Sequence, residues 1–314
     1  MAGLDRTGGY DGSASPLFTT VMPQVLRVVL DTNVFSPSHF DSLRNSPFRG
    51  LCARGRVQPI YPGVMIEEVL QSYGSPLARP QLLADWIPMI LDTAPRLCDD
   101  LVSIFRKELV QGRGPNAMIF MPAPKERQVR DQLTSIPADG SWDLMDATRL
   151  EREDAQRKRV ARRETSKDMR QVVARQARQR GLKIVPGSIP ATFTPGKEDL
   201  VELMAKALLQ KFVSPNGWQS LFAAWRRRKG HYPFFTQFAQ DVVFQEVHFM
   251  TDHASGIDIN AQADLEILMH LLRADAIVSN ETGFLKEAFS ANWRQKGKVL
   301  FTSNEFGEHL RKLV

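Results

Sequence analysis

The pattern of apolar and polar positions along the chain predicts short strands followed by helices. The run VLRVVL at 25–30 is apolar and rich in β-branched residues, which is typical of a buried strand, and residues 57–60 form a second, shorter run of this kind. After Pro62, apolar residues recur at helical spacing and the pattern ends at Gly74. The opening of the chain therefore predicts two strands, the second of which leads into a helix.

The remainder of the chain continues this alternation. Helical spacing runs through 80–110, where Pro95 separates two pieces, and further elements are expected at 197–212, 233–250, 260–273, 275–280, 281–289, 298–302 and 304–313. The fourth and sixth of these are apolar runs of the strand type, and the others are expected to be helices. Strands that alternate with helices usually pair in parallel through right-handed crossovers. We therefore predict the α/β class with a mainly parallel central sheet.

Composition divides the chain into a leading segment, a domain and an insertion in that domain. Residues 1–24 are rich in Gly, Ser and Asp without a period, and we expect them to be flexible. Residues 112–196 have few apolar positions, prolines near both ends and a mostly charged middle, which predicts a basic helical insertion. Residues 25–111 and 197–314 are therefore expected to form one domain around it.

The overall composition excludes several classes of protein. With 314 residues, 43% of them apolar and 24% charged, the chain can bury a core without staples. No apolar run is long enough to span a bilayer, and the first residues lack the basic and apolar regions of a secretory signal. The two cysteines, Cys52 and Cys98, lack metal-ligand spacing, which favours free thiols in a reducing compartment. We expect a cytoplasmic protein with no membrane segment.

Positive charge is concentrated in two stretches, although the net charge of +6 is small for this length. An arginine-rich run lies at 152–180, and a basic stretch with Trp225, Tyr232 and Phe234 lies at 224–235. Both stretches are candidates for contact with a polyanion, and the aromatic rings are candidates for stacking on bases. The candidate nucleic-acid-binding residues are Arg162, Arg163, Arg170, Arg226, Arg227, Arg228 and Lys229. The alternative is a solvated charged helix beside aromatic residues that face the core.

Four carboxylates fall where an open α/β sheet places its ligand site. Such sites form outside the carboxyl ends of the strands, where Asp31 ends the first strand and Glu281 follows a later one. Glu68 and Asp264 lie in helices, the latter about one turn beyond Asn260, which could cap its helix. Each alone has a structural explanation as a turn residue or a helix acid. Together they would repel one another unless they held a cation, and their hard oxygen atoms favour Mg²⁺ or Mn²⁺.

Four segments of the chain carry a resemblance to a known family. They are VVLDTNVF, YPGVMIEEVLQ, ADLEILMHLLRADAIVSNETGFLKEAF and VLFTSNEFGEHL, and they lie within residues 25–73 and 260–314. In this order they resemble the motifs of the PIN domain family of metal-dependent nucleases. The resemblance implies a three-layer α/β/α sandwich in which acidic residues bind one or two Mg²⁺ or Mn²⁺ ions and RNA is cleaved. The insertion has no counterpart in the small single-domain members, such as toxin–antitoxin ribonucleases.

The resemblance assigns roles to individual residues. Asp31 matches the first aspartate of the family, and Asn33 matches the small polar residue that accompanies it. Glu68 matches the glutamate of the first crossover helix, with the adjacent Glu67 as an alternate. Asp264 matches the third acidic residue.

The last motif departs from the family pattern at one position. The sequence Ser279, Asn280 and Glu281 matches the Thr-Asn-Asp that ends the fourth strand, and Glu281 is one methylene longer than the usual aspartate. That extra length is expected to shift or weaken the metal. The implied metal ligands are Asp31, Glu68, Asp264 and Glu281, and the implied positioning residues are Asn33, Ser279 and Asn280.

These residues and the resemblance together predict an endoribonuclease. It would use Mg²⁺ or Mn²⁺ and a metal-activated water to hydrolyse phosphodiester bonds, with single-stranded RNA as the favoured substrate. Two alternatives stay open: a non-catalytic RNA-binding protein of PIN-like fold within a larger assembly, and a toxin or defence nuclease held by an inhibitory protein partner. A DNA 5′-flap nuclease fits less well, because no additional acidic cluster is evident. The sequence leaves open the RNA target, the number of metal ions and the oligomeric state.

Overall fold

A computed structural model describes the protein over most of its length. The described residues are 25–73, 79–112, 119–136, 197–213, 217–251 and 260–314, with a few positions between 154 and 181. The expected flexible segment 1–24 and most of the expected insertion 112–196 lie outside the described residues.

Within the described residues, four short strands form one parallel sheet. They are β1 (Leu26–Leu30), β2 (Val57–Ile60), β3 (Ala276–Val278) and β4 (Val299–Phe301), in the order β2-β1-β3-β4. β1 pairs with β2 on one side and with β3 on the other, and β4 pairs with β3. The predicted α/β class with a parallel central sheet is confirmed, and each strand lies within the residues that the sequence indicated.

The central place of β1 follows from its side chains, which are apolar on both faces. Val28, Val29 and Leu30 are fully buried, as expected for a parallel strand covered on two sides. β2 contains Pro59, which has no backbone N–H to donate, and β2 accordingly lies at an edge of the sheet. The chain therefore leaves β1 from the middle of the fold, and the residue that follows this strand is held inside it.

Helices and short helical turns connect the strands. The first part of the chain forms η1 (Thr32–Phe35), α1 (Phe40–Arg44), α2 (Phe48–Ala53), α3 (Gly63–Tyr73), α4 (Arg79–Gln81), η2 (Leu82–Trp86), α5 (Ile87–Thr93), α6 (Leu101–Phe105), η3 (Arg106–Val110) and α7 (Ala123–Thr134). The second part forms α9 (Lys197–Phe212), α10 (Trp218–Arg227), η5 (Lys229–His231), α11 (Pro233–Thr251), α12 (Ala261–Met269), η6 (His270–Leu272), α13 (Phe284–Asn292), η7 (Arg294–Lys296) and α14 (Ser303–Arg311).

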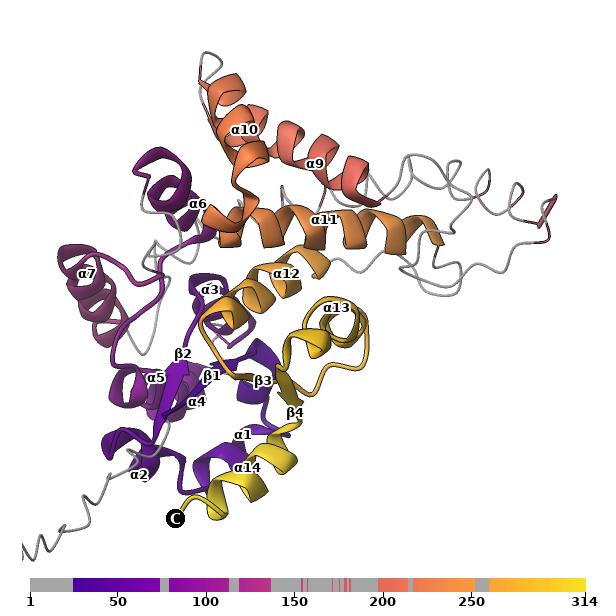
Figure 1. Ribbon diagram of the computed structural model, residues 1–314. Coiled ribbons are helices and arrows are strands. Elements are labelled where there is room, and N and C mark those ends of the chain that lie inside the picture. The colour runs from indigo at the N-terminus through magenta and orange to yellow at the C-terminus, as the bar shows by residue number, and fades with distance from the viewer. Residues whose placement is uncertain are drawn as a thin grey trace, which may run out of the picture.

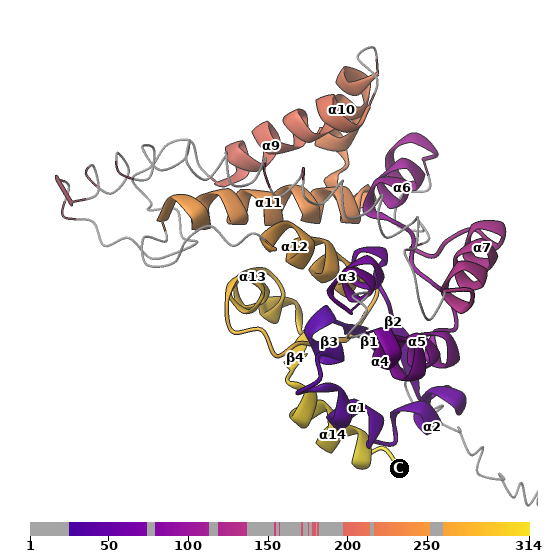
Figure 2. The ribbon, with the colours of Figure 1, turned by 180° about the vertical axis from the view of Figure 1, so that it is seen from behind.

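The helices cover both sides of the sheet. α3, α12 and α13 lie on one side, and α1 and α14 lie on the other, as both views show (Figure 1, Figure 2). α14 packs against α1 and α2, with the rings of Phe48 and Phe306 in contact at 6.1 Å between centroids. On the other side, α12 packs against α3, α11 and α13. The sheet therefore lies inside the molecule, and the site must form at one of its ends.

Beyond α12, the helices α9, α10 and α11 pack on one another (Figure 1). α10 was not predicted, because its last residues, 224–227, were assigned to a basic stretch. Its Trp225 is fully buried between the rings of Phe222 and Phe235, and the indole N–H donates to Thr236 Oγ1 at 2.9 Å. Phe234 is also buried. The alternative in which these aromatic residues face the core therefore holds for Trp225 and Phe234, which are not available to stack on bases.

A buried carboxylate joins the two parts of the chain. Glu108, in η3, accepts the backbone N–H groups of Phe234 at 3.0 Å and Phe235 at 2.8 Å, which belong to the first turn of α11. Those N–H groups have no partner within their own helix, so Glu108 satisfies them. Burial raises the pKa of Glu108 to about 7, against the two N–H bonds and the attraction of Arg273. This contact fixes α11 to the helices that come before the insertion.

Ion pairs join α7 and η3 to the loop between α5 and α6. Lys107 Nζ lies 2.8 Å from Asp99 Oδ2, and Lys125 Nζ lies 2.5 Å from Asp99 Oδ1. Arg96 Nε lies 2.5 Å from Glu126 Oε2. Because Asp99 and Glu126 are buried, salt screens each of these pairs less than it screens a pair on an open surface. α7 lies within the residues assigned to the insertion, and it packs on α5; the boundary at residue 112 stays a prediction.

Two expectations from composition concern helices and thiols. In the segments that the structure describes, no helix has both the length and the apolar character needed to cross a bilayer. Cys52 is partly exposed and Cys98 is buried, and both are free thiols. Burial raises the pKa of Cys52 to about 12 and also raises that of Cys98, so neither has the low pKa of a reactive thiolate.

Candidate active site

Asp31 follows β1 directly and is held at the carboxyl end of the sheet. It is the N-cap of η1, where its Oδ1 accepts the backbone N–H of Thr32 at 2.7 Å. Its Oδ2 accepts the hydroxyl of Ser279, which follows β3, at 2.7 Å. Only 5% of the residue is exposed. Asp31 therefore does act as a turn residue, but the turn uses only one of the two oxygen atoms of its carboxylate.

Ser279 links the segments that follow β1 and β3. Its hydroxyl donates to Asp31 and accepts from Asn33 Nδ2 at 3.1 Å and from the backbone N–H of Glu281 at 3.0 Å. One donor and two acceptor positions are all that a hydroxyl offers, so Ser279 is fully used. Asn33 Oδ1 in turn accepts the backbone N–H of Asn280 at 2.9 Å. The sequence placed Asn33 and Ser279 as positioning residues, and the structure brings both to Asp31.

Asn280 is bound to a different neighbour. Its Nδ2 donates to Ser303 Oγ at 2.7 Å, and its Oδ1 accepts the backbone N–H of Ser303 at 3.0 Å. Ser303 is the first residue of α14, which directly follows β4. Both ends of the amide therefore hold the start of α14 against the loop after β3. Asn280 fixes the shape of this edge of the sheet through α14.

Glu68 reaches the same edge from α3. Its Oε2 accepts the hydroxyl of Thr32 at 2.7 Å, and the residue is partly buried, whereas Glu67 is exposed. Thr32 also donates its backbone N–H to Asp31. The two carboxylates are therefore joined through a single threonine, which the sequence analysis did not single out. Of the two adjacent glutamates, the structure brings Glu68 to Asp31.

Glu281 is the third acidic residue of this group, beside Asp31 and Glu68. Burial and, to a lesser extent, repulsion from Glu68 and Glu281 together raise the pKa of Asp31 to about 7, against the hydrogen bonds from Ser279 and Thr32. Both glutamates therefore lie close enough for their charge to act on Asp31. The three come from different parts of the chain: the end of β1, the helix after β2 and the loop after β3.

Asp264 is placed less directly. It lies in the first turn of α12 and is 9% exposed, and its backbone N–H donates to the carbonyl of Asn260 at 3.0 Å. Asn260 is the N-cap residue, as expected, but its side chain makes no capping bond. α12 packs against α3, the helix that carries Glu68. Asp264 therefore lies on a helix next to the site, and it is not among the main influences on the pKa of Asp31.

The chemistry of these side chains suits a hard cation. In the described part of the chain, no Lys or Arg forms an ion pair with Asp31, Glu68 or Glu281. Carboxylate oxygen atoms are the ligands that Mg²⁺ and Mn²⁺ prefer. Among the same residues, however, no three His, Cys, Asp or Glu side chains are close enough to form a ready metal site. The donor atoms suit such an ion in their chemistry, although the structure does not gather these side chains into a site for it.

The basic residues predicted to bind nucleic acid lie elsewhere. Arg226, Arg227, Arg228 and Lys229 are at the end of α10 and the start of η5. Arg226 and Lys229 pair with Glu202, at 3.1 Å and 3.0 Å, and Lys229 also lies over the ring of Trp225. Part of this charge is therefore neutralised within the fold. Arg162, Arg163 and Arg170 lie outside the described residues.

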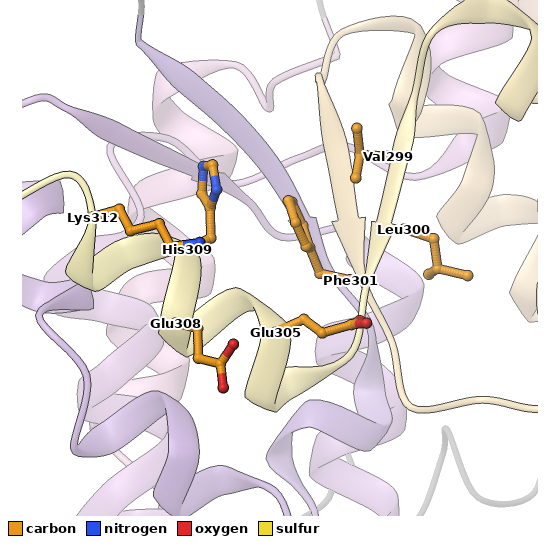
Figure 3. A pocket seen from close by; sticks show the side chains of 7 residues that line it. All are labelled: Val299, Leu300, Phe301, Glu305, Glu308, His309 and Lys312. Carbon is orange, nitrogen blue, oxygen red and sulfur yellow. The ribbon is translucent and has the colours of Figure 1, made fainter.

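Two hollows flank the edge strand β4. One, of about 380 Å³, lies against α14 and is lined by Glu305, Glu308, His309 and Lys312 among others (Figure 3). It contains none of the predicted site residues. The other, of about 360 Å³, includes Ser279, Asn280 and Glu281 in its wall. The second hollow therefore contains Glu281 of the acidic group, and it meets Asp31 through Ser279.

Comparisons with known proteins identify no relative of this chain. The chain matches no family model, no curated protein and no solved structure. A function must therefore be argued from the geometry of this chain and from the resemblance of its motifs.

Proposed function

We propose that the protein is a Mg²⁺- or Mn²⁺-dependent endoribonuclease of the PIN type. The observation that carries the proposal is the buried carboxylate of Asp31 at the end of the central strand, with Glu68 and Glu281 beside it and no cationic side chain among them. Buried acidic groups without a cationic partner are costly to maintain and are typical of functional sites.

The fold supports this proposal. In an open parallel sheet, the loops at the carboxyl ends of the strands form the ligand crevice. Here the residues after β1 and β3 are bonded to each other at that edge, and helices lie on both sides of the sheet (Figure 1). This is the arrangement expected of the three-layer α/β/α sandwich that the motifs imply.

Each side chain has a role in the proposed reaction. Asp31, Glu68, Asp264 and Glu281 would hold the ion. Bound Mg²⁺ or Mn²⁺ supplies a water of lowered pKa and neutralises charge on the phosphodiester. Ser279 orients Asp31, and Asn33 orients Ser279, so the first ligand is held in place before an ion arrives. Thr32 holds Glu68 at the same edge.

The proposal predicts that Asp31→Asn abolishes cleavage of single-stranded RNA in the presence of Mn²⁺. Asp31 would be both a metal ligand and one of the negative charges that attract the ion, so its loss should lower the cleavage rate by about 10²-fold or more. The matched control is Asp275→Asn. Asp275 precedes β3 at the opposite edge of the sheet, where its Oδ2 accepts the backbone N–H of Arg27 at 2.9 Å. The assay is the appearance of shortened fragments of a labelled oligoribonucleotide.

The outcome separates the alternatives. If Asp31→Asn cleaves as fast as the wild type, the assigned chemistry is wrong. If neither protein cleaves and RNA binding is unchanged by a chelator, the protein is the non-catalytic RNA-binding alternative. If expression of the wild type alone arrests growth and Asp31→Asn relieves it, a partner-controlled toxin or defence nuclease is favoured. Binding of Mn²⁺ by calorimetry, with Glu68→Gln and Asp264→Asn beside the wild type, tests the ligand set without reference to activity.

A further inference from the structure

A groove leads away from the acidic group along the edge of the sheet. It lies between α13 and β4, has a volume of about 360 Å³, and begins at Ser279 and Glu281. Its wall continues through Lys286, Arg294 and Lys298 to β4. We call it the α13–β4 groove. Because Ser279 also bonds Asp31, the groove and the candidate active site share a wall.

Three cations line one side of this groove. Lys286 is on α13, Arg294 is in η7, and Lys298 precedes β4. Lys286 and Arg294 are exposed, and neither makes an ion pair within the described residues. Lys298 Nζ donates to the carbonyl of Ala274 at 2.6 Å, which leaves its charge without a carboxylate. Lys286 and Arg294 therefore remain free to bind an anion, and Lys298 adds its positive charge to the same wall.

The acidic residues of the groove are placed at one end or are already bonded. Glu281 is at the end that meets Asp31. Glu305 is the N3 residue of a capping box in α14, where its Oε2 accepts the backbone N–H of Thr302 at 2.8 Å and the hydroxyl of Thr302 at 2.9 Å. Bonding to Thr302 lowers the pKa of Glu305, so this carboxylate stays charged and fixed to its helix. The groove is therefore negatively charged at Glu281 and Glu305 and positively charged along α13 and η7.

Other basic surfaces lack this combination. In the stretch Arg226 to Lys229, the two ends are paired with Glu202. The hollow on the other side of β4 is lined by Lys312 and His309 together with Glu305 and Glu308 (Figure 3). In the described part of the chain, the α13–β4 groove is the place where free cations and the acidic group share one wall.

We propose that the α13–β4 groove holds the sugar-phosphate backbone of single-stranded RNA on its way to the acidic group. This inference rests on the proposed function. Phosphates would lie against Lys286, Arg294 and Lys298, which act without regard to base sequence. Three residues of β4 span about 10 Å, the rise of roughly three stacked nucleotides at 3.4 Å each. Glu281 repels phosphate at the end of the groove next to Asp31. A phosphodiester of the RNA would therefore occupy that end only when a cation is bound.

The experiment measures binding of a fluorescein-labelled oligouridylate by anisotropy, in EDTA so that no cleavage occurs. The double variant Lys286→Ala/Arg294→Ala removes two cations of the groove. The control Arg311→Ala/Lys312→Ala removes two exposed cations of α14 and gives the same net charge. The groove variant should bind about 10-fold or more weakly, and the slope of log Kd against log salt should fall by about 1.4, at about 0.7 for each phosphate contact of a single strand. The control should change both quantities little.

Equal weakening in the two double variants overturns the groove, because only net charge would then matter. Unchanged binding in the groove variant also overturns it. Lys286→Arg/Arg294→Lys, which keeps both charges, should restore binding. Failure of the proposed function has a different result: wild type binds through the groove but yields no fragments with Mn²⁺. All three double variants should have the circular dichroism spectrum of the wild type, because the substituted side chains are exposed.

Discussion

At the scale of single residues, the candidate site depends on the hydroxyl of Ser279. It donates to Asp31 and accepts from Asn33 and from the backbone of Glu281, so one oxygen atom holds two loops together. A threonine or serine at this position is expected from the motif. That all three of its bonds are made could not be expected, because they depend on how closely β1 and β3 pair.

Ser279→Ala should therefore lower stability as well as function. It leaves two donors near the buried edge without their acceptor, and it removes a bond that opposes the raised pKa of Asp31. The free energy of unfolding should fall by about 1–3 kcal/mol, as measured by urea denaturation in EDTA. Ser290→Ala, at an exposed position on α13, should change it by about 0.5 kcal/mol or less. Equal stabilities for the two variants would show that the Ser279 bonds are not formed in solution.

At the scale of elements, the contact between Glu108 and α11 gives stability a pH dependence. The pKa of Glu108 is about 7 in the folded protein and 4.5 in the reference state, so folding favours its protonated form. Its contribution is fully present below pH 4.5 and is lost as the pH rises through 7.

Glu108→Gln removes this titration. Relative to the variant, the wild type should lose up to about 3 kcal/mol of stability between pH 4.5 and pH 7.5, because each unit of pKa shift corresponds to about 1.4 kcal/mol. Urea denaturation across that range in EDTA measures the difference, and Glu308→Gln, on an exposed face of α14, is the control. A difference that stays constant with pH would contradict the raised pKa.

Most elements with a clear local pattern were predicted, and α10 is an exception. VLRVVL is apolar on both faces, so the central strand was evident. α10 was not predicted, although its residues Trp218, Leu221, Phe222 and Trp225 follow helical spacing. The arginines that follow them were interpreted as part of a binding surface. The sequence alone left open whether Glu67 or Glu68 belongs to the site. In the structure, a hydrogen bond to Glu68 from Thr32, which lies in a different element, distinguishes the two glutamates.

At the scale of the whole molecule, an aromatic cluster connects the parts before and after residues 137–196. Phe105, in α6, is almost fully buried and contacts the rings of Phe212, Phe235 and Phe238, at 5.9, 5.7 and 5.2 Å between centroids. These partners belong to α9 and α11. The cluster and Glu108 together bind the two parts to each other, as expected if they form one domain.

Phe105→Ala tests whether the two parts unfold together. Loss of the buried ring should cost about 3–5 kcal/mol, and the whole thermal transition should move to lower temperature as one step. Val102→Ala, on the same helix but 45% exposed, should move it by little. Two separate calorimetric transitions in the variant would indicate that the parts fold independently.

The strand order has a consequence for synthesis. β1 is made early, but its partner β3 and the hydroxyl of Ser279 lie far along the chain, 248 residues after Asp31. A chain grows at about 5–20 residues per second, so Asp31 waits many seconds on the ribosome before Ser279 and Glu281 emerge. During that time half of the central sheet is missing and the acidic group is incomplete. If the protein is the proposed ribonuclease, a partly synthesised chain would therefore lack a complete site and could not cleave the RNA that encodes it.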